Sequence, residues 1–205
     1  MLVECGFVRA ADSEGREWSF TPSLGRIAAL ADPREIVAIF GRLLGHAPAT
    51  AAGLPAPDPA VDAAAVLAAL CDQEDATPLI GHVEQAPDGR GLQHVPGAMP
   101  RAELLIIARH LMQHGIAGES KPGKAGASEG RYSDRFNAAE FITAARVHLG
   151  LSGEEAEALS MTELQRMLAM KFPDAAAERQ RNVPTREEYD ALMARLKQRK
   201  GAGGG

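Results

Sequence analysis

The sequence predicts a mainly helical α+β protein with a small β component, in which an N-terminal β-hairpin precedes a multi-helix bundle. Aromatic residues make up only 4% of the 205 residues. Ala, Leu, Ile, Val and Met must therefore fill the core, and these residues suit close helix packing better than a large sheet. Apolar residues recur at helical spacing in most segments, whereas short runs typical of strands, flanked by turn residues, occur in two places.

A β-hairpin is expected first. Residues 2–8 and 16–20 fit two short strands, and Asp12-Ser-Glu-Gly15 between them has the composition of a turn in which Gly adopts a positive φ. Two helices should follow, one after the capping residue Ser23 and one after Asp32-Pro33. Asp accepts hydrogen bonds from the first free amides of a helix, and Pro lacks the amide hydrogen that would be unsatisfied there.

A stretch rich in Ala, Pro and Gly interrupts this pattern at residues 46–60 and is expected to be a linker, because Pro biases the preceding residue away from helix. A helix is predicted from Asp62 to Cys71 by propensity. Residues 78–96 then indicate a second hairpin, with residues 79–83 as its first strand.

The segment from Arg101 to His114 is the most apolar helix candidate. Its apolar residues fall on two sides of the helix, with Leu104, Leu105, Ala108, Leu111 and Met112 on one side and Ile106 and Ile107 on the other. A helix that is apolar on both sides is buried on both, so either it crosses the centre of the domain or a partner covers one face. Gly115 is expected to end this helix.

Residues 118–130 hold no apolar side chain larger than Ala or Pro, so a flexible loop is expected over residues 118–132. This loop separates an N-terminal region, residues 1–117, from a helical C-terminal subdomain, residues 133–200. A Gly-rich tail, residues 201–205, closes the chain.

The C-terminal subdomain carries four helix signals. A helix is expected over residues 137–149, and Ser152-Gly-Glu-Glu155 forms a capping box that opens a short one. Thr162 is expected to cap the third helix, and a second capping box, Thr185-Arg-Glu-Glu188, opens the last. The apolar stripe of this last helix consists of Tyr189, Leu192, Met193 and Leu196.

Charge and cysteine content narrow the class of protein. The net charge of -5 and pI near 5.7 argue against general nucleic-acid binding, which needs an excess of Lys and Arg. Cys5 and Cys71 lack metal-binding or disulfide-framework spacing and are expected to be reduced core thiols. A signal peptide and a long apolar run are both lacking, which predicts a cytoplasmic protein without a membrane partner.

No catalytic motif stands out, so a non-enzyme without cofactor or metal is expected. His110 and His114 have the spacing of two metal ligands on a helix, but the Glu of a His-Glu-x-x-His site is missing. Glu140 and His148 are the residues available as further ligands, and a metalloenzyme stays the weaker alternative. Otherwise the two histidines are expected to lie at a helix C-terminus and bond its last carbonyls.

Segments spread over most of the chain match one family. They are Trp18–Ser23, Asp32–Val37, Leu104–Ile116, Phe136–Ile142, Ala144–Arg146, Met161–Leu164, Lys171–Pro173 and Thr185–Tyr189. Together they resemble a family of small proteins from long-tailed bacteriophages and prophages, whose members look like tail assembly chaperones. The resemblance implies a cytoplasmic protein that coats the tape-measure protein and recruits tail-tube subunits. A structural tail completion or connector protein retained in the virion is the alternative, and homo-oligomerisation stays open.

Two helices supply the candidate protein-binding residues. Both carry apolar side chains that a helical partner would cover. The candidates are Leu104, Ile106, Ile107 and Leu111 in the central helix, and Tyr189, Leu192, Met193 and Leu196 in the last one.

Overall fold

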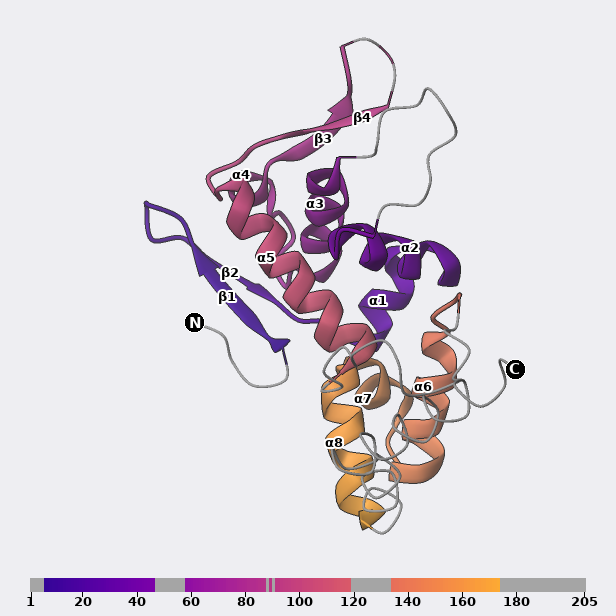
Figure 1. Ribbon diagram of the computed structural model, residues 1–205. Coiled ribbons are helices and arrows are strands. Elements are labelled where there is room, and N and C mark those ends of the chain that lie inside the picture. Colours follow the sequence, from indigo (N-terminus) through magenta and orange to yellow (C-terminus); the bar gives the residue numbers. More distant parts are fainter. Residues whose placement is uncertain (1–5, 47–57, 88, 90, 119–133, 174–205) are drawn as a thin grey trace, which may run out of the picture.

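The computed structural model describes residues 6–46, 58–87, 89, 91–118 and 134–173. Helices make up most of it, and two separate antiparallel hairpins lie at the periphery (Figure 1), so the predicted mainly helical α+β fold is confirmed. In these ranges no helix combines the length and apolar character needed to span a bilayer. The elements are β1 (Val8–Ala11), β2 (Glu17–Phe20), α1 (Leu24–Leu30), α2 (Pro33–Leu43), α3 (Pro59–Leu70), α4 (Thr77–Ile80), β3 (His82–Gln85), β4 (Leu92–Val95), α5 (Arg101–Met112), η2 (Gln113–Ala117), α6 (Ala138–Ala144), η3 (Ala145–Leu149), α7 (Gly153–Ala158) and α8 (Met161–Lys171), where η marks a π-helix.

The N-terminal hairpin is present, but its first strand lies later than predicted. β1 begins at Val8 and ends at Ala11, whereas residues 2–8 were expected to form this strand. The carboxylate of Asp12 explains the shift, because it accepts hydrogen bonds from the backbone amides of Glu14 and Arg16 at 2.9 and 3.0 Å. This turn sets the register, so the strand runs up to the turn itself.

Asp-Pro pairs begin two helices. Asp32 caps α2 as predicted, and its carboxylate accepts bonds from the amides that follow Pro33. Asp58 caps α3 in the same way by accepting from the amide of Ala60 at 2.9 Å. The last two residues of the predicted linker are therefore helical, and residues 47–57 lie outside the described residues.

α3 and α5 form the centre of the core. Both pack against each other and against α2. α3 buries one broad side and leaves Ala65 and Ala68 exposed on the other, and its small alanines let neighbouring helices approach closely. α5 crosses the centre of the domain, which is the first of the two arrangements that the sequence allowed for a helix apolar on both sides. The buried residues of the two helices are Ala60, Ala63, Ala64, Val66, Leu67, Leu70, Leu104, Ala108, Leu111 and Met112.

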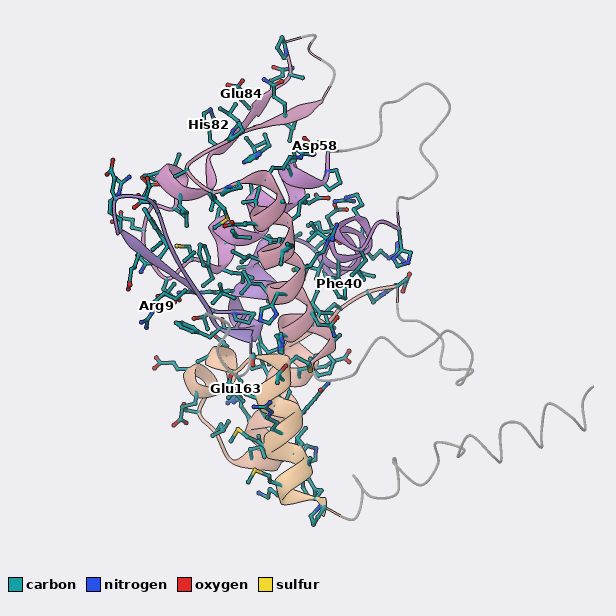
Figure 2. All side chains as sticks on the ribbon, turned by 60° about the vertical axis from the view of Figure 1, so that its left-hand side comes forward. Arg9, Phe40, Asp58, His82, Glu84 and Glu163 are labelled. Atoms are coloured by element: carbon teal, nitrogen blue, oxygen red, sulfur yellow. The ribbon has the colours of Figure 1, made fainter. Side chains whose placement is uncertain are left out.

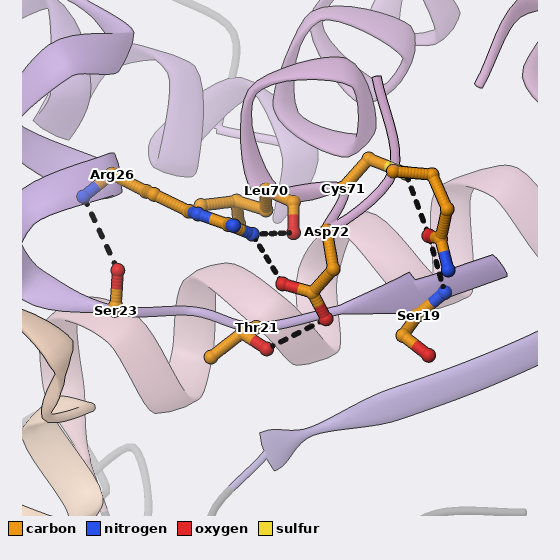
Figure 3. A network of polar contacts seen from close by, with 8 residues as sticks. Ser19, Thr21, Ser23, Arg26, Leu70, Cys71 and Asp72 are labelled. Carbon is orange, nitrogen blue, oxygen red and sulfur yellow. Dashed lines mark hydrogen bonds and ion pairs between the residues drawn. The ribbon is translucent and has the colours of Figure 1, made fainter. Parts of the chain in front are cut away.

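A polar network joins the hairpin to the end of α3 and to α1 (Figure 3). The carboxylate of Asp72 accepts a bond from the Thr21 hydroxyl at 3.0 Å and pairs with the Arg26 guanidinium at 2.5 Å. Arg26 also donates to the carbonyl of Leu70 at 2.9 Å. Cys71 is buried and forms no disulfide with any residue that the structure describes, and burial raises the pKa of its thiol. Cys5, the other cysteine, lies outside the described residues.

The second hairpin is confirmed, although its first strand is shorter than predicted. Leu79 and Ile80 are buried in the short helix α4, and β3 begins only at His82. Gly81 separates the two elements with φ +81°, and a Cβ there would lie 1.9 Å from the carbonyl oxygen of Val95. The close approach of β4 therefore requires glycine at this turn.

The C-terminal helices share one core with the N-terminal region. The amide of Leu24 donates to the carbonyl of Leu159 at 2.8 Å, and the amide of Phe136 donates to the carbonyl of Pro33 at 2.8 Å. Buried side chains from α6, η3, α7 and α8 belong to the same hydrophobic cluster as those of α3 and α5. The predicted loop, from residue 119 onward, and the residues after 173 lie outside the described part.

The helix expected to stop at Gly115 continues as η2 to Ala117, so that prediction is wrong. A Cβ at Gly115 would lie 2.9 Å from two side-chain carbons of Ile27, which is fully buried in α1. Glycine is thus needed here for the close contact with α1 and does not break the helix. Gly118, with φ +74°, ends η2.

The capping box at Ser152 and Glu155 is confirmed at the start of α7. Thr162 does not cap α8, contrary to the prediction. Ser160 caps it instead, and the carboxylate of Glu163 accepts a bond from the amide of Ser160 at 2.8 Å. Ser160-Met-Thr-Glu163 is itself a capping-box sequence, and Thr162 is fully buried within the first turn.

Candidate protein-binding surface

The predicted binding residues of α5 lie at different depths. Leu104 and Leu111 are fully buried, and Ile107 is partly buried against the core. Only Ile106 is open to solvent, with 61% of its surface exposed. A partner contacts only what solvent reaches, so Leu104 and Leu111 are core residues and not part of a binding surface. The other four candidates, Tyr189, Leu192, Met193 and Leu196, lie outside the described residues.

The structure brings the two predicted histidines together at the junction of α5, η2 and α8. The ring centroids of His110 and His114 are 4.5 Å apart. His114 Nδ1 lies 2.8 Å from the hydroxyl oxygen of Thr162, which connects η2 to α8. His110 Nε2 is buried, with no hydrogen-bond partner among the described residues. Burial lowers the pKa of His110, and the neighbouring His114 lowers it further.

The part of the chain that the structure describes contains no group of three His, Cys, Asp or Glu side chains arranged to hold a metal. Glu140 is in α6, where its carboxylate accepts a bond from the side chain of Asn137 at 2.8 Å. The His148 ring meets Phe172 edge-on at 6.0 Å. Two imidazoles provide half of the four ligands usual in a structural zinc site.

Exposed apolar side chains occur on η3 and at the end of α8, two elements that pack together. Met170 is 83% exposed, Val147 71% and Phe172 42%. We call these three residues the distal surface. α8 buries Met161 and Leu164 in its first half, which anchors this end of the helix in the core. The other end exposes apolar side chains to solvent.

The direction of α8 places this surface away from the core. Glu163, in its first turn, lies at the junction with the N-terminal region, and the helix runs from there away from α5 (Figures 1 and 2). Two exposed basic side chains, Arg146 on η3 and Lys171 on α8, come from the same two elements. Apolar residues bordered by charge are typical of surfaces that bind other proteins.

The model of a family of unknown function, DUF6246, matches residues 20–191. The chain belongs to this family. The match begins at the end of β2 and includes α1 to α8 and Tyr189, so it spans the core, the distal surface and part of the last predicted helix. No curated protein and no solved structure matches the chain.

Sequence reasoning missed the distal surface of this DUF6246 protein, although a signal for it exists. Met167, Leu168, Met170 and Phe172 are spread around the helix axis, and one neighbour cannot cover them all. The burial pattern agrees, because Met167 and Leu168 are half-buried while Met170 points into solvent. The surface offers exposed apolar side chains and basic side chains on the same two elements.

Proposed function

We propose that this DUF6246 protein is a phage tail assembly chaperone. It binds the tape-measure protein, the tail-tube subunits or both in the cytoplasm of the host bacterium during tail morphogenesis, and it does so without catalysis. The resemblance of segments such as Trp18–Ser23 and Phe136–Ile142 to phage tail proteins supports the choice of partner. The structure supports the mode of action by offering a surface for protein binding.

The distal surface is the observation that carries this proposal. Apolar surface in water costs about 25 cal/mol per Å², and a partner that covers Met170, Val147 and Phe172 recovers that free energy. A long helical partner fits, because the apolar stripe of an amphipathic helix docks on such surfaces through residues one turn apart. The basic side chains Arg146 and Lys171 favour a partner helix with acidic residues beside its stripe.

Co-expression with the cognate tape-measure protein tests the proposal. The wild-type chain should keep the tape measure soluble, and the double variant Val147→Ser/Met170→Ser should reduce the soluble fraction severalfold. Ile106→Ser is the matched control, since it removes an apolar side chain of α5 that is 61% exposed, and it should leave solubility unchanged.

Three outcomes would count against the proposal. A tape measure that is equally insoluble with and without the chain would remove the chaperone function. Stoichiometric amounts of the chain in purified virions, measured by mass spectrometry, would identify a structural tail component instead. Loss of solubility in Ile106→Ser alone would move the binding surface to α5.

A further inference from the structure

We propose that His110 and His114 form an acid-sensitive latch that holds α8 against the centre of the domain. His110 is in the last turn of α5, and His114 follows one turn later in η2. Their ring centroids lie 4.5 Å apart. The closed latch holds fewer protons on this pair of rings than the open latch does, so acid favours opening.

The latch reaches α8 through hydrogen bonds from η2. His114 Nδ1 lies 2.8 Å from the hydroxyl oxygen of Thr162, which is fully buried in the first turn of α8. Three residues further along α8, the side chain of Gln165 donates to the carbonyl of Ala117 at 3.0 Å. Polar contacts therefore join η2 and α8 at two places, and separation of the two elements would expose the buried first half of α8.

A second proton is costly for the closed pair. His110 is half-buried, and its Nε2 atom has no hydrogen-bond partner among the described residues. The protonated ring carries an N–H at both nitrogens, so protonation would leave a buried donor without an acceptor. Burial lowers the pKa of His110, and His114 lowers it further. Two charged rings at this separation also repel each other, so the closed pair resists holding two protons.

The charged groups on the neighbouring elements do not offset this cost. Glu35 and Asp62 both pair with Arg42, and the carboxylate of Glu163 accepts a bond from the amide of Ser160. These carboxylates are therefore already engaged, and the basic groups oppose protonation of His110. The charged groups on the elements packed against α5 and η2 are Arg26 on α1, Arg34, Glu35 and Arg42 on α2, Asp62 on α3, and Glu163, Arg166 and Lys171 on α8.

Acid shifts the latch towards its open form. In the open form water surrounds both rings, and His110 regains the ordinary imidazole pKa of 6.5. Opening should therefore become more frequent as the pH falls below 6.5, until the closed form takes up the same proton. Each unit by which closure lowers the pKa of His110 allows about a tenfold increase in the open fraction.

Hydrogen exchange in the full-length protein tests the latch, with mass spectrometry to locate the exchanging amides. From about pH 7.5 to about pH 5.5, the range in which imidazole titrates, protection of α8 should fall roughly tenfold more than protection of α3, after correction for intrinsic exchange rates. His110→Gln keeps a polar side chain that cannot be protonated, and it should remove this difference. His148→Gln is the matched control, because η3 also packs on α8, and it should keep the difference.

Three results would overturn the proposal. Equal loss of protection in α3 and α8 would mean that the whole domain opens together. A difference that persists in His110→Gln, or one that disappears in His148→Gln, would place the acid response elsewhere. Neither the variants nor the readout involves a partner protein, so the outcome does not depend on the proposed function.

A titration of the wild-type protein decides the question if His110→Gln does not fold. Nuclear magnetic resonance follows each imidazole separately as the pH is lowered. The ring of His110 should titrate at lower pH than the ring of His82, whose side chain is 53% exposed on β3. Titration of His110 at the same pH as His82, or at a higher one, would refute the latch.

Discussion

α5 and α8 are both apolar on more than one side, yet they end in different surroundings. α5 lies against α2, α3 and η2, and these neighbours cover both of its apolar sides except at Ile106. α8 packs on η2 and η3 and leaves Met170 in water. The spacing of apolar residues therefore shows which sides of a helix are suited to burial. Which neighbours cover those sides is determined by the whole fold.

The largest effect on the free energy of unfolding is expected for substitutions in α5. Leu104→Ala should lower the free energy of unfolding by about 2–5 kcal/mol, because it leaves a cavity beside α3, whereas Ile106→Ala should change it by less than about 0.5 kcal/mol. Urea denaturation of both variants measures the difference. Similar losses from both would mean that α5 is not the centre of the core.

A smaller effect is expected within α8. Ser160→Ala should cost about 1 kcal/mol, because the amide of Glu163 loses the hydroxyl that caps it. Met170→Ser, at the other end of the helix, should leave the free energy of unfolding nearly unchanged. Thermal unfolding of the pair tests whether α8 is anchored only at its start, and an equal loss at Met170 would contradict that arrangement.

The smallest effect on stability is expected for His110, near the end of α5, and it depends on pH. The pKa of His110 is lowered below its ordinary value of 6.5, so the unfolded chain binds this proton more readily than the folded one. Stability should therefore fall as the pH drops below 6.5 and through the lowered pKa of His110. His110→Gln should reduce this dependence when the thermal midpoint is followed from neutral to acidic pH. Identical pH profiles would show that His110 does not contribute.

Local signals were sufficient for most helix starts. Asp32-Pro33 predicts the start of α2, and the same pair at Asp58-Pro59 starts α3, although the surrounding Ala and Pro residues concealed it. At α8 two capping residues compete, and the pairing of Ser160 with Glu163 prevails over Thr162. These choices depend on a few neighbouring residues, so a closer reading of the sequence would have found them.

Tertiary contacts account for what the sequence could not predict. Gly115 resembles a helix stop, and only the contact with Ile27 shows why glycine is there. Likewise, Leu104 and Ile106 are equally apolar in the sequence, and only the neighbours of α5 separate a core residue from an exposed one. The same limit applies to the distal surface, which exists because no described element covers Met170.

The long-range pairing of α1 orders events during synthesis on the ribosome. Strand β2 can dock on the chain around Cys71 once α3 has been made. The hydrogen bond from the amide of Leu24 to Leu159 and the bridge between Ser23 and Ser160 form later. Both need nearly all of the described chain to have emerged. In that interval the side of α1 that α6 and α7 later cover is exposed on the nascent chain. The unfinished protein is therefore most prone to aggregation just before its last helices are translated.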